Sequence, residues 1–203
     1  MTLSEFDNEI RKDYDVVCGC EAGRGPLAGD VFAAAVIFDK DTVIEGINDS
    51  KKLTAKKREE LFDEIMEKAV DFSIQTATVE EIEDINILNA AMLAMKRAVE
   101  DMDTKPDVCL IDGNKTPEGL ECPAIAVVKG DAKSQAVAAA SILAKVARDR
   151  YMEQMAEQYP EYRFEKHKGY GTKLHYQMID QYGPCGIHRM SFLKKYYAKK
   201  NGH

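Results

Sequence analysis

Residues 15–38 read "DVVCGCEAGRGPLAGDVFAAAVIF" and contain two apolar runs on either side of a glycine-rich turn. The first run, residues 15–20, is short and bounded by glycine, so we expect a strand. The second run, residues 31–38, is continuously apolar, which predicts a strand that is buried on both faces. The tight turn between them carries the carboxylate of Glu21 at its start and the guanidinium of Arg24. These two strands are therefore expected at the centre of a sheet, with charged groups at one end.

The rest of the chain alternates between strand patterns and helix patterns. Further strands are predicted at residues 71–79, 107–114 and 124–128. Helices are predicted at residues 55–70, 87–100 and 133–159, and another follows a loop at residues 167–175. This order predicts an α/β fold around one central sheet.

The composition is that of a soluble globular protein. The 203 residues are 45% hydrophobic and 31% charged, which suits one domain with a sizeable core. No apolar run approaches the length of a membrane span, and the N-terminus has no signal-peptide pattern. We therefore expect no membrane partner. The five cysteines contain no C-x-x-C pair, so we expect reduced thiols and a cytoplasmic location.

The charge distribution limits what the protein can bind. A net charge of -7 argues against non-specific binding of nucleic acid by the average surface. Lysines and arginines nevertheless outnumber acids beyond residue 160, which permits a local site for a polyanion. A solvated basic helix would give the same pattern, so both interpretations stay open.

Three acidic residues follow predicted strands and lie close to glycines: Glu21, Asp112 and Asp131. Strand ends in α/β sheets converge on a crevice, where clustered carboxylates repel each other unless a cation neutralises them. Carboxylate oxygens select Mg²⁺ or Mn²⁺, and such cations suit phosphodiester hydrolysis. The alternative is that each acid is only a turn or capping residue. The Gly23–Arg24–Gly25 turn is equally open, because it could present amides and a guanidinium to a phosphate or be purely structural.

Six motifs, in family order and with family-like spacing, resemble bacterial ribonuclease HII, the type 2 ribonuclease H. They are "EAGRGPLAG", "NDSKKLT", "LIDGN", "KGDAKSQAVAAASILAKVARDRYM", "HKGYGTKLH" and "GIHRMSF". The resemblance implies a ribonuclease H-like fold, with a mixed central sheet flanked by helices. It also implies a single domain over residues 1–203, in which residues from about 160 to 203 form a C-terminal helical extension, and a monomer.

The resemblance implies an endonuclease that uses Mg²⁺ or Mn²⁺ to cut the RNA strand of RNA/DNA hybrids and single ribonucleotides in duplex DNA. Products would carry 5′-phosphates. Glu21, Asp112 and Asp131 match three of the family's metal-binding acids. Gly23, Arg24 and Gly25 match the turn that reads the ribose 2′-hydroxyl, and Tyr170 matches the tyrosine that packs on the nucleotide beyond the cut. Lys51, Lys52, Ser141 and Lys145 fall in motifs expected near the phosphate backbone. His167 and His188 are interpreted as structural hydrogen-bonding residues.

The chain departs from the family pattern at one decisive place. The family has Gly-x-Asp-Glu before the turn, whereas this chain has Gly19–Cys20–Glu21. Either Cys20 replaces the Asp and x is lost, or Cys20 is x and the Asp itself is lost. In both cases a carboxylate is missing, and Cys20 stands at or beside its position in the metal site. A neutral thiol binds Mg²⁺ poorly.

We therefore expect a protein that binds its duplex and cuts it slowly with Mg²⁺, with some activity restored by Mn²⁺. The alternative is a catalytically weak or inactive module that only binds ribonucleotide-containing duplexes. If instead the change was engineered, or one residue is absent from the written sequence, the parent is an ordinary active enzyme. Asp30 stands where the family usually has proline, which is interpreted as a tolerated turn substitution.

Overall fold

The computed structural model describes residues 1–48 and 50–200, with the side chain of Lys51 also outside the described part. Five strands form one sheet in the order β3-β2-β1-β4-β5. The strands are β1 (Val17–Ala22), β2 (Val31–Ile37), β3 (Asp71–Ala77), β4 (Val108–Asp112) and β5 (Ala124–Val127). β2 is antiparallel to β1 and β3, while β4 is parallel to β1 and β5. The predicted mixed central sheet is confirmed.

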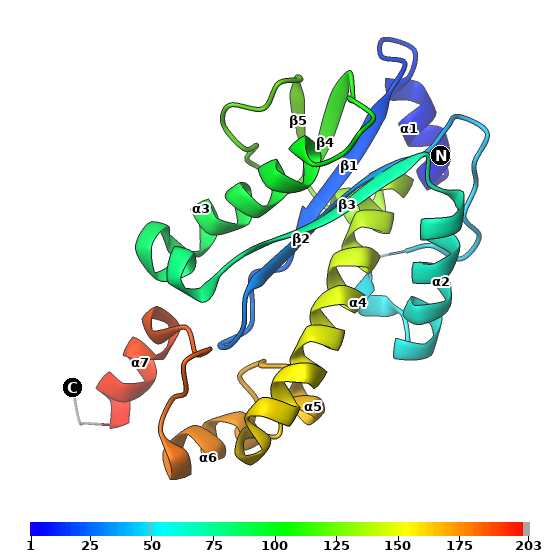
Figure 1. The fold of residues 1–203 in the computed structure, drawn as a ribbon. Coiled ribbons are helices and arrows are strands. Elements are labelled where there is room, and N and C mark those ends of the chain that lie inside the picture. The colour runs from blue at the N-terminus through cyan, green and yellow to red at the C-terminus, as the bar shows by residue number, and fades with distance from the viewer. Residues whose placement is uncertain (49, 201–203) are drawn as a thin grey trace.

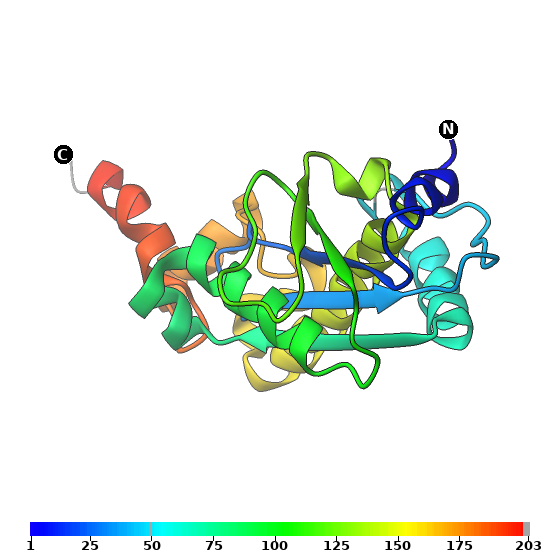
Figure 2. The same cartoon turned by 90° about the horizontal axis from the view of Figure 1, so that it is seen from above.

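Helices cover both faces of this sheet. They are α1 (Leu3–Ile10), α2 (Ala55–Lys68), α3 (Val79–Glu100), α4 (Gln135–Gln158), α5 (Phe164–His167), α6 (Lys173–Tyr182) and α7 (Met190–Lys200). Figure 1 shows α3 on one face, and α2 and α4 on the other. Seen from above, α7 lies at the end of the molecule opposite α1 (Figure 2). Within the described ranges, no helix combines the length and apolarity needed to cross a membrane.

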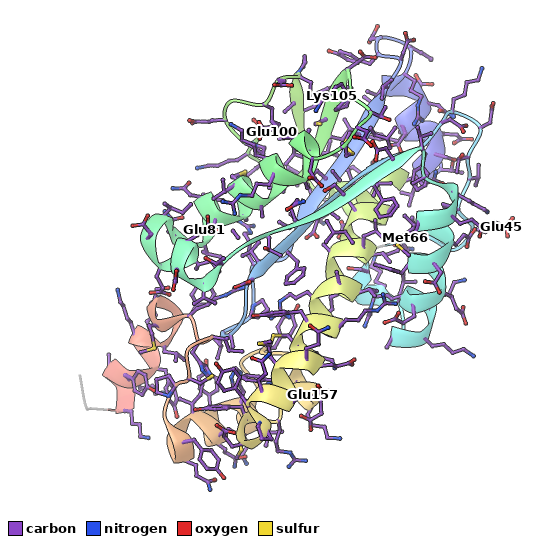
Figure 3. All side chains as sticks on the ribbon, viewed as in Figure 1. Glu45, Met66, Glu81, Glu100, Lys105 and Glu157 are labelled. Carbon is purple, nitrogen blue, oxygen red and sulfur yellow. The ribbon has the colours of Figure 1, made fainter. Side chains whose placement is uncertain are left out.

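The alternation of side chains along β2 divides the core into two layers. Ala33, Ala35 and Ile37 pack towards α3, whereas Ala34 and Val36 pack towards α2 and α4. Both layers are buried, which confirms that this strand is covered on both faces. Figure 3 shows the side chains that fill the space between the sheet and its helices.

The first turn of α4 lies directly on β1. A Cβ atom added to Gly19 would lie 2.2 Å from the carbonyl carbon of Ala136 and 2.2 Å from the nitrogen of Val137. Real side chains never come so close to backbone atoms, so this position requires glycine. Asp7 of α1 holds the same turn in place, because its carboxylate accepts a hydrogen bond from the Ala136 nitrogen at 2.9 Å. The register of β1 against α4 is therefore fixed.

Two helical segments differ from the sequence prediction. α1 was not predicted, although Thr2 and Glu5 form a capping box at its start. α3 begins at Val79 rather than at residue 87. At Asn86 the backbone leaves the helical conformation, with φ at 69°, and the Asn86 side chain accepts hydrogen bonds from the nitrogens of Leu88 and Asn89. The predicted helix is thus the second half of α3, which starts with its own cap.

A substitution at Gly19 tests the contact between β1 and α4. Gly19→Ala should lower the free energy of unfolding by about 3 kcal/mol or more, because backbone atoms of α4 must move to admit the methyl group. Urea denaturation followed by circular dichroism measures this change. Gly23→Ala is the matched control, since no described heavy atom beyond its chain neighbours lies within 4 Å of an added Cβ there. Equal stabilities of the two variants would contradict the fixed register.

Candidate active site

Two carboxylates lie next to each other at the carboxyl end of the central parallel strands. Cys20 pairs with Ile111, so the following residues, Glu21 and Asp112, occupy neighbouring positions on β1 and β4. Alternation along the strands points both towards α4, the side on which Leu110 packs. Neighbouring strands are about 4.8 Å apart, and two negative charges at that spacing favour a cation between them.

Asp131 lies in the short helical turn η2 (Gly130–Ala132), beside this pair. The Gly130 nitrogen donates a 2.7 Å hydrogen bond to Oδ1 of Asp112, which brings the Asp131 backbone next to the Asp112 carboxylate. Within residues 1–48 and 50–200, however, no three His, Cys, Asp or Glu side chains converge closely enough to hold a metal ion. The donors fit Mg²⁺ or Mn²⁺ in kind, because all are carboxylate oxygens, but they do not form a complete cage.

Cys20 does not belong to this carboxylate group. Its side chain is fully buried in the α3-facing layer of the core, where its Sγ lies 3.8 Å from the carbonyl oxygen of Met95. Burial raises the pKa of the Cys20 thiol well above its ordinary value, so the thiol stays neutral. Adjacent residues of a strand point to opposite faces, and Cys20 therefore points away from Glu21. The thiol thus lies on the other face of β1 from the carboxylates, and the position of Cys20 at or beside the missing aspartate stays a prediction.

A cavity of about 330 Å³ opens beside the two carboxylates. Its lining includes Glu21 and Asp112, the turn of residues 23–25, Tyr170 from the C-terminal part, and apolar side chains of α3. The ring of Tyr170 faces the turn, with its Cε1 at 3.6 Å from where a Gly25 Cβ would stand. The cavity thus brings together acids, glycine backbone and an aromatic ring from three distant parts of the sequence.

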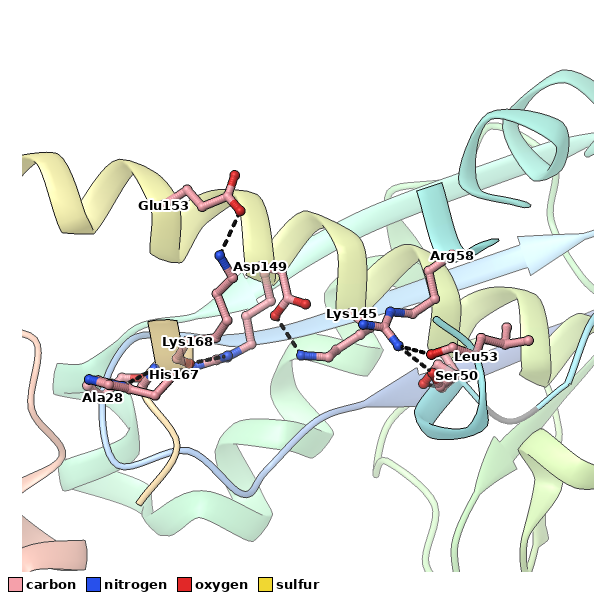
Figure 4. Close-up of polar contacts among 12 residues, drawn as sticks. Ala28, Ser50, Leu53, Arg58, Lys145, Asp149, Glu153, His167 and Lys168 are labelled. Atoms are coloured by element: carbon pink, nitrogen blue, oxygen red, sulfur yellow. Dashed lines mark hydrogen bonds and ion pairs between the residues drawn. The ribbon is translucent and has the colours of Figure 1, made fainter. Parts of the chain in front are cut away.

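Basic side chains border the same region. Lys145 pairs with Asp149 at 2.6 Å (Figure 4), and its Nζ lies 5.1 Å from the centre of the Tyr170 ring. Lys52 is exposed, whereas the side chain of Lys51 lies outside the described residues. Ser141 is buried, and its hydroxyl is hydrogen-bonded to that of Ser50 at 2.8 Å. It is therefore less accessible than a direct contact with the phosphate backbone of a nucleic acid requires.

Asp30 has a local structural role. Its Oδ1 accepts a hydrogen bond from the nitrogen of Val79 at 3.0 Å, at the start of α3. Proline at this position would offer no such acceptor. The aspartate therefore ties the end of the glycine-rich turn to the start of α3.

Comparisons with known proteins give one consistent result. The sequence pattern of the family "Ribonuclease HII" matches residues 19–195. Ribonuclease HII of Caldicellulosiruptor saccharolyticus is 54% identical over 189 residues, which cover 93% of this chain and 92% of that protein. Ribonuclease HII of Idiomarina loihiensis is 58% identical over 178 residues, which cover 87% of this chain and 95% of that protein.

The chain belongs to the ribonuclease HII family. Its family is therefore one of endoribonucleases of the ribonuclease H type, as the motifs implied.

Solved structures agree on the fold. Ribonuclease H2 from Pyrococcus horikoshii OT3 superposes with a TM-score of 0.74 at 27% identity, covering 92% of this chain and 98% of that one. Bst-RNase HIII, solved in complex with Mn²⁺, has a TM-score of 0.70 over 92% of this chain and 70% of that one. At 16% identity the second likeness concerns the fold alone.

Arg189, in the "GIHRMSF" motif, supports the candidate site in a way that the sequence did not predict. Its guanidinium is fully buried and donates hydrogen bonds to backbone carbonyls of the glycine-rich turn. The acceptors are the carbonyl oxygens of Gly29 at 2.8 Å, Pro26 at 2.9 Å, Arg24 at 3.0 Å and Asp30 at 3.1 Å. Burial lowers the pKa of Arg189 to about 10, which still leaves it a cation at neutral pH. One side chain thus shapes the turn that faces the cavity. The motif is the only signal that points to it in the sequence.

The substitution Arg189→Lys tests whether the hydrogen bonds of Arg189 hold the glycine-rich turn in this ribonuclease HII. A single ammonium group cannot reach all four carbonyls, so the buried oxygens lose partners. We expect a loss of about 3 kcal/mol in the free energy of unfolding, measured by urea denaturation. Arg150→Lys is the control, because Arg150 forms an exposed ion pair with Glu59 and such pairs contribute only about 0.5 kcal/mol. Similar small losses in both variants would mean that Arg189 does not hold the turn.

Proposed function

We propose that this chain is a divalent-metal-dependent endonuclease that cuts the RNA strand of RNA/DNA hybrids and single ribonucleotides in duplex DNA, leaving 5′-phosphates. It would act in the cytoplasm as a monomer whose residues 1–203 form one domain. The observation that carries the proposal is the shared cavity, which joins the carboxylates Glu21 and Asp112 to the Gly23–Gly25 turn and Tyr170.

Recognition of the ribonucleotide would depend on backbone rather than side chains. The 2′-hydroxyl is the group that separates RNA from DNA, and glycines at positions 23 and 25 allow a sugar to approach the amides of the turn closely. Space above Gly23 is open among the described residues. Tyr170 would pack on the next nucleotide, while Lys52 and Lys145 would position phosphates. Lys51 and Ser141 belong to the same motifs, and Ser141 would act through Ser50 rather than by direct contact.

Metal binding would use Glu21 and Asp112, joined by Asp131. When bound, Mg²⁺ or Mn²⁺ would activate water and stabilise the leaving oxygen. The chain's own residues hold the carboxylates in place: Gly130 orients Asp112 by its 2.7 Å hydrogen bond, and the pairing of β1 with β4 sets Glu21 beside it.

The register of β1 supports a specific account of the missing residue. Gly19 faces α4, and Glu21, two residues later, faces the same side. In the family pattern Gly-x-Asp-Glu, the residue two places after glycine is the aspartate. Glu21 would therefore take the place of the aspartate, Cys20 would be x, and the second carboxylate would be the one that is lost. Reduced rather than normal cleavage follows, because one negative charge near the cation is absent.

Inserting an aspartate between Cys20 and Glu21 tests the function and the register together. The new side chain would face α4, and the glutamate would turn to the opposite side. We expect Mg²⁺-dependent cleavage of a duplex with one ribonucleotide to rise at least about 100-fold, equivalent to about 2.7 kcal/mol in the barrier. Single-turnover kinetics with Mg²⁺, and then with Mn²⁺, measure the change.

The matched control inserts asparagine at the same place, which restores the length of the strand without the charge. It should leave cleavage slow. If the original chain cleaves at the rate of the Asp insertion, the proposed defect is wrong. If both proteins bind the ribonucleotide duplex and neither cuts it, the chain is a binding module. A lack of preference for ribonucleotide-containing over all-DNA duplex would exclude both functions.

A further inference from the structure

Three buried histidines surround the loop that carries Tyr170. His167 ends α5, His175 lies in α6, and His188 precedes α7; all three are buried. The rings of His167 and His175 stack with centroids 4.2 Å apart, and those of His175 and His188 are 5.2 Å apart. His167 and His188 are hydrogen-bonded within the protein, as expected for both. The geometry, however, indicates a more specific role for this cluster.

The hydrogen bonds of the cluster run in a single direction. Nδ1 of His175 lies 3.0 Å from the carbonyl oxygen of Tyr170, and a carbonyl can only accept, so Nδ1 carries the proton. Nε2 of His175 is then an acceptor, and it faces Nε2 of His188 at 3.0 Å, which must donate. Nδ1 of His188 is left as an acceptor. It receives the backbone N–H of Cys185 at 2.9 Å.

Each end of this chain of bonds is set by a backbone group with one possible role. The carbonyl of Cys185 lies farther from Nδ1 of His188, at 3.3 Å, and it already accepts the backbone N–H of His188 at 3.0 Å. With both rings neutral and in these tautomers, each hydrogen bond of the chain has one donor and one acceptor. The Sγ of Cys185 also lies close to Nδ1 of His188, at 3.1 Å.

The pKa shifts agree with this geometry. Burial, helped by the neighbouring His167, lowers the pKa of His175 to about 3 and that of His188 to about 4. The titratable groups that face the cluster are Glu165 from α5, Tyr162 from the turn η3 (Pro160–Tyr162), and the thiol of Cys185. From α4, Arg148 donates to the carbonyl of Lys168 at 2.9 Å.

Further hydrogen bonds, from His167 and from the glycine-rich turn, hold the loop that carries Tyr170. His167 accepts the N–H of Gly169 at Nδ1, at 3.2 Å, and therefore donates from Nε2 to the carbonyl of Tyr162 at 3.0 Å. The Leu27 nitrogen donates to the carbonyl of Gly169 at 2.8 Å, which joins the loop to the glycine-rich turn. Tyr170 itself is 39% exposed, so burial alone does not fix its ring; Lys145 and Arg148 lie over the ring, and the hydrogen bonds of its loop hold the backbone.

We propose that His188 and His175 are positioning residues for ribonucleotide recognition: their one-directional hydrogen-bond relay, running from Cys185 to the Tyr170 carbonyl, holds the Tyr170 ring against Gly25. The inference rests on the proposed function, in which Tyr170 contacts the substrate. It extends that function by assigning the selectivity of the site to a buried relay that never touches nucleic acid.

The relay itself is tested without any substrate. Long-range ¹H–¹⁵N imidazole spectra at about pH 7 should show Nδ1–H on His175 and Nε2–H on His188. Because their pKa values are about 3 and about 4, both rings should keep these signals while the protein stays folded. A cationic ring at neutral pH, or Nδ1–H on His188, would overturn the relay whatever the protein does to RNA.

The role in recognition is tested by binding with divalent cations chelated, so that no cleavage occurs. The readout is the ratio of affinities for duplex DNA with one ribonucleotide and for all-DNA duplex. His175→Phe keeps an aromatic ring beside His167 but removes both hydrogen bonds, and should reduce the ratio about tenfold. His175→Asn can still donate to the Tyr170 carbonyl and should restore most of the ratio.

Tyr162→Phe is the matched control, because it removes a 2.8 Å hydrogen bond to the Gly183 carbonyl in the same aromatic cluster without touching the relay. It should leave the ratio unchanged. If His175→Phe fails to fold, His188→Gln replaces it in the experiment. This variant keeps a donor towards His175 but loses the acceptor for Cys185, and it should lower the ratio. An unchanged ratio in every folded relay variant refutes the inference. No preference in the unaltered protein refutes the proposed function, and the positioning role with it.

Discussion

The contact between the first turn of α4 and Gly19 of β1 is the constraint on which the site depends. Backbone atoms of α4 occupy the space in which any side chain at position 19 would stand. The buried alanines of α4 pack closely on the sheet and prevent the helix from moving away. A slip of β1 by one residue would turn Glu21 into the apolar layer under α3 and Cys20 towards α4. The close packing therefore decides which of two adjacent side chains meets Asp112.

The C-terminal helices belong to the site rather than being an appendage. Arg189 holds four carbonyls of the glycine-rich turn, and the backbone bonds Gly29 to Ile187 and Leu27 to Gly169 join the same segments. The two carboxylates of the sheet would remain in place without these contacts, because strand pairing alone sets them. The shape of the turn and the position of Tyr170 would not. The carboxylate pair and the glycine-rich turn thus have separate structural supports.

The sequence predicts the sheet well because apolar runs and glycine-rich turns are local signals. The hairpin of residues 15–38, the alanine-rich α4 and the acids at strand ends all follow from such patterns. The face to which Cys20 points could not be predicted in the same way, because it depends on the register with α4, which lies more than a hundred residues away. The contacts of Arg189 and His175 were not predicted for the same reason, because their partners lie on other segments of the chain and local patterns do not reveal them.

The dependence of the turn on Arg189 has a consequence for biosynthesis. The strands and their carboxylates are complete once α4 has been made, but the guanidinium that shapes the turn comes from near the end of the chain. A nascent chain still attached to the ribosome, or a product truncated before Arg189, would carry the acids without the guanidinium that holds the turn. Under the proposed function, such an intermediate would hold the carboxylates of the metal site before the turn that recognises the ribonucleotide is formed.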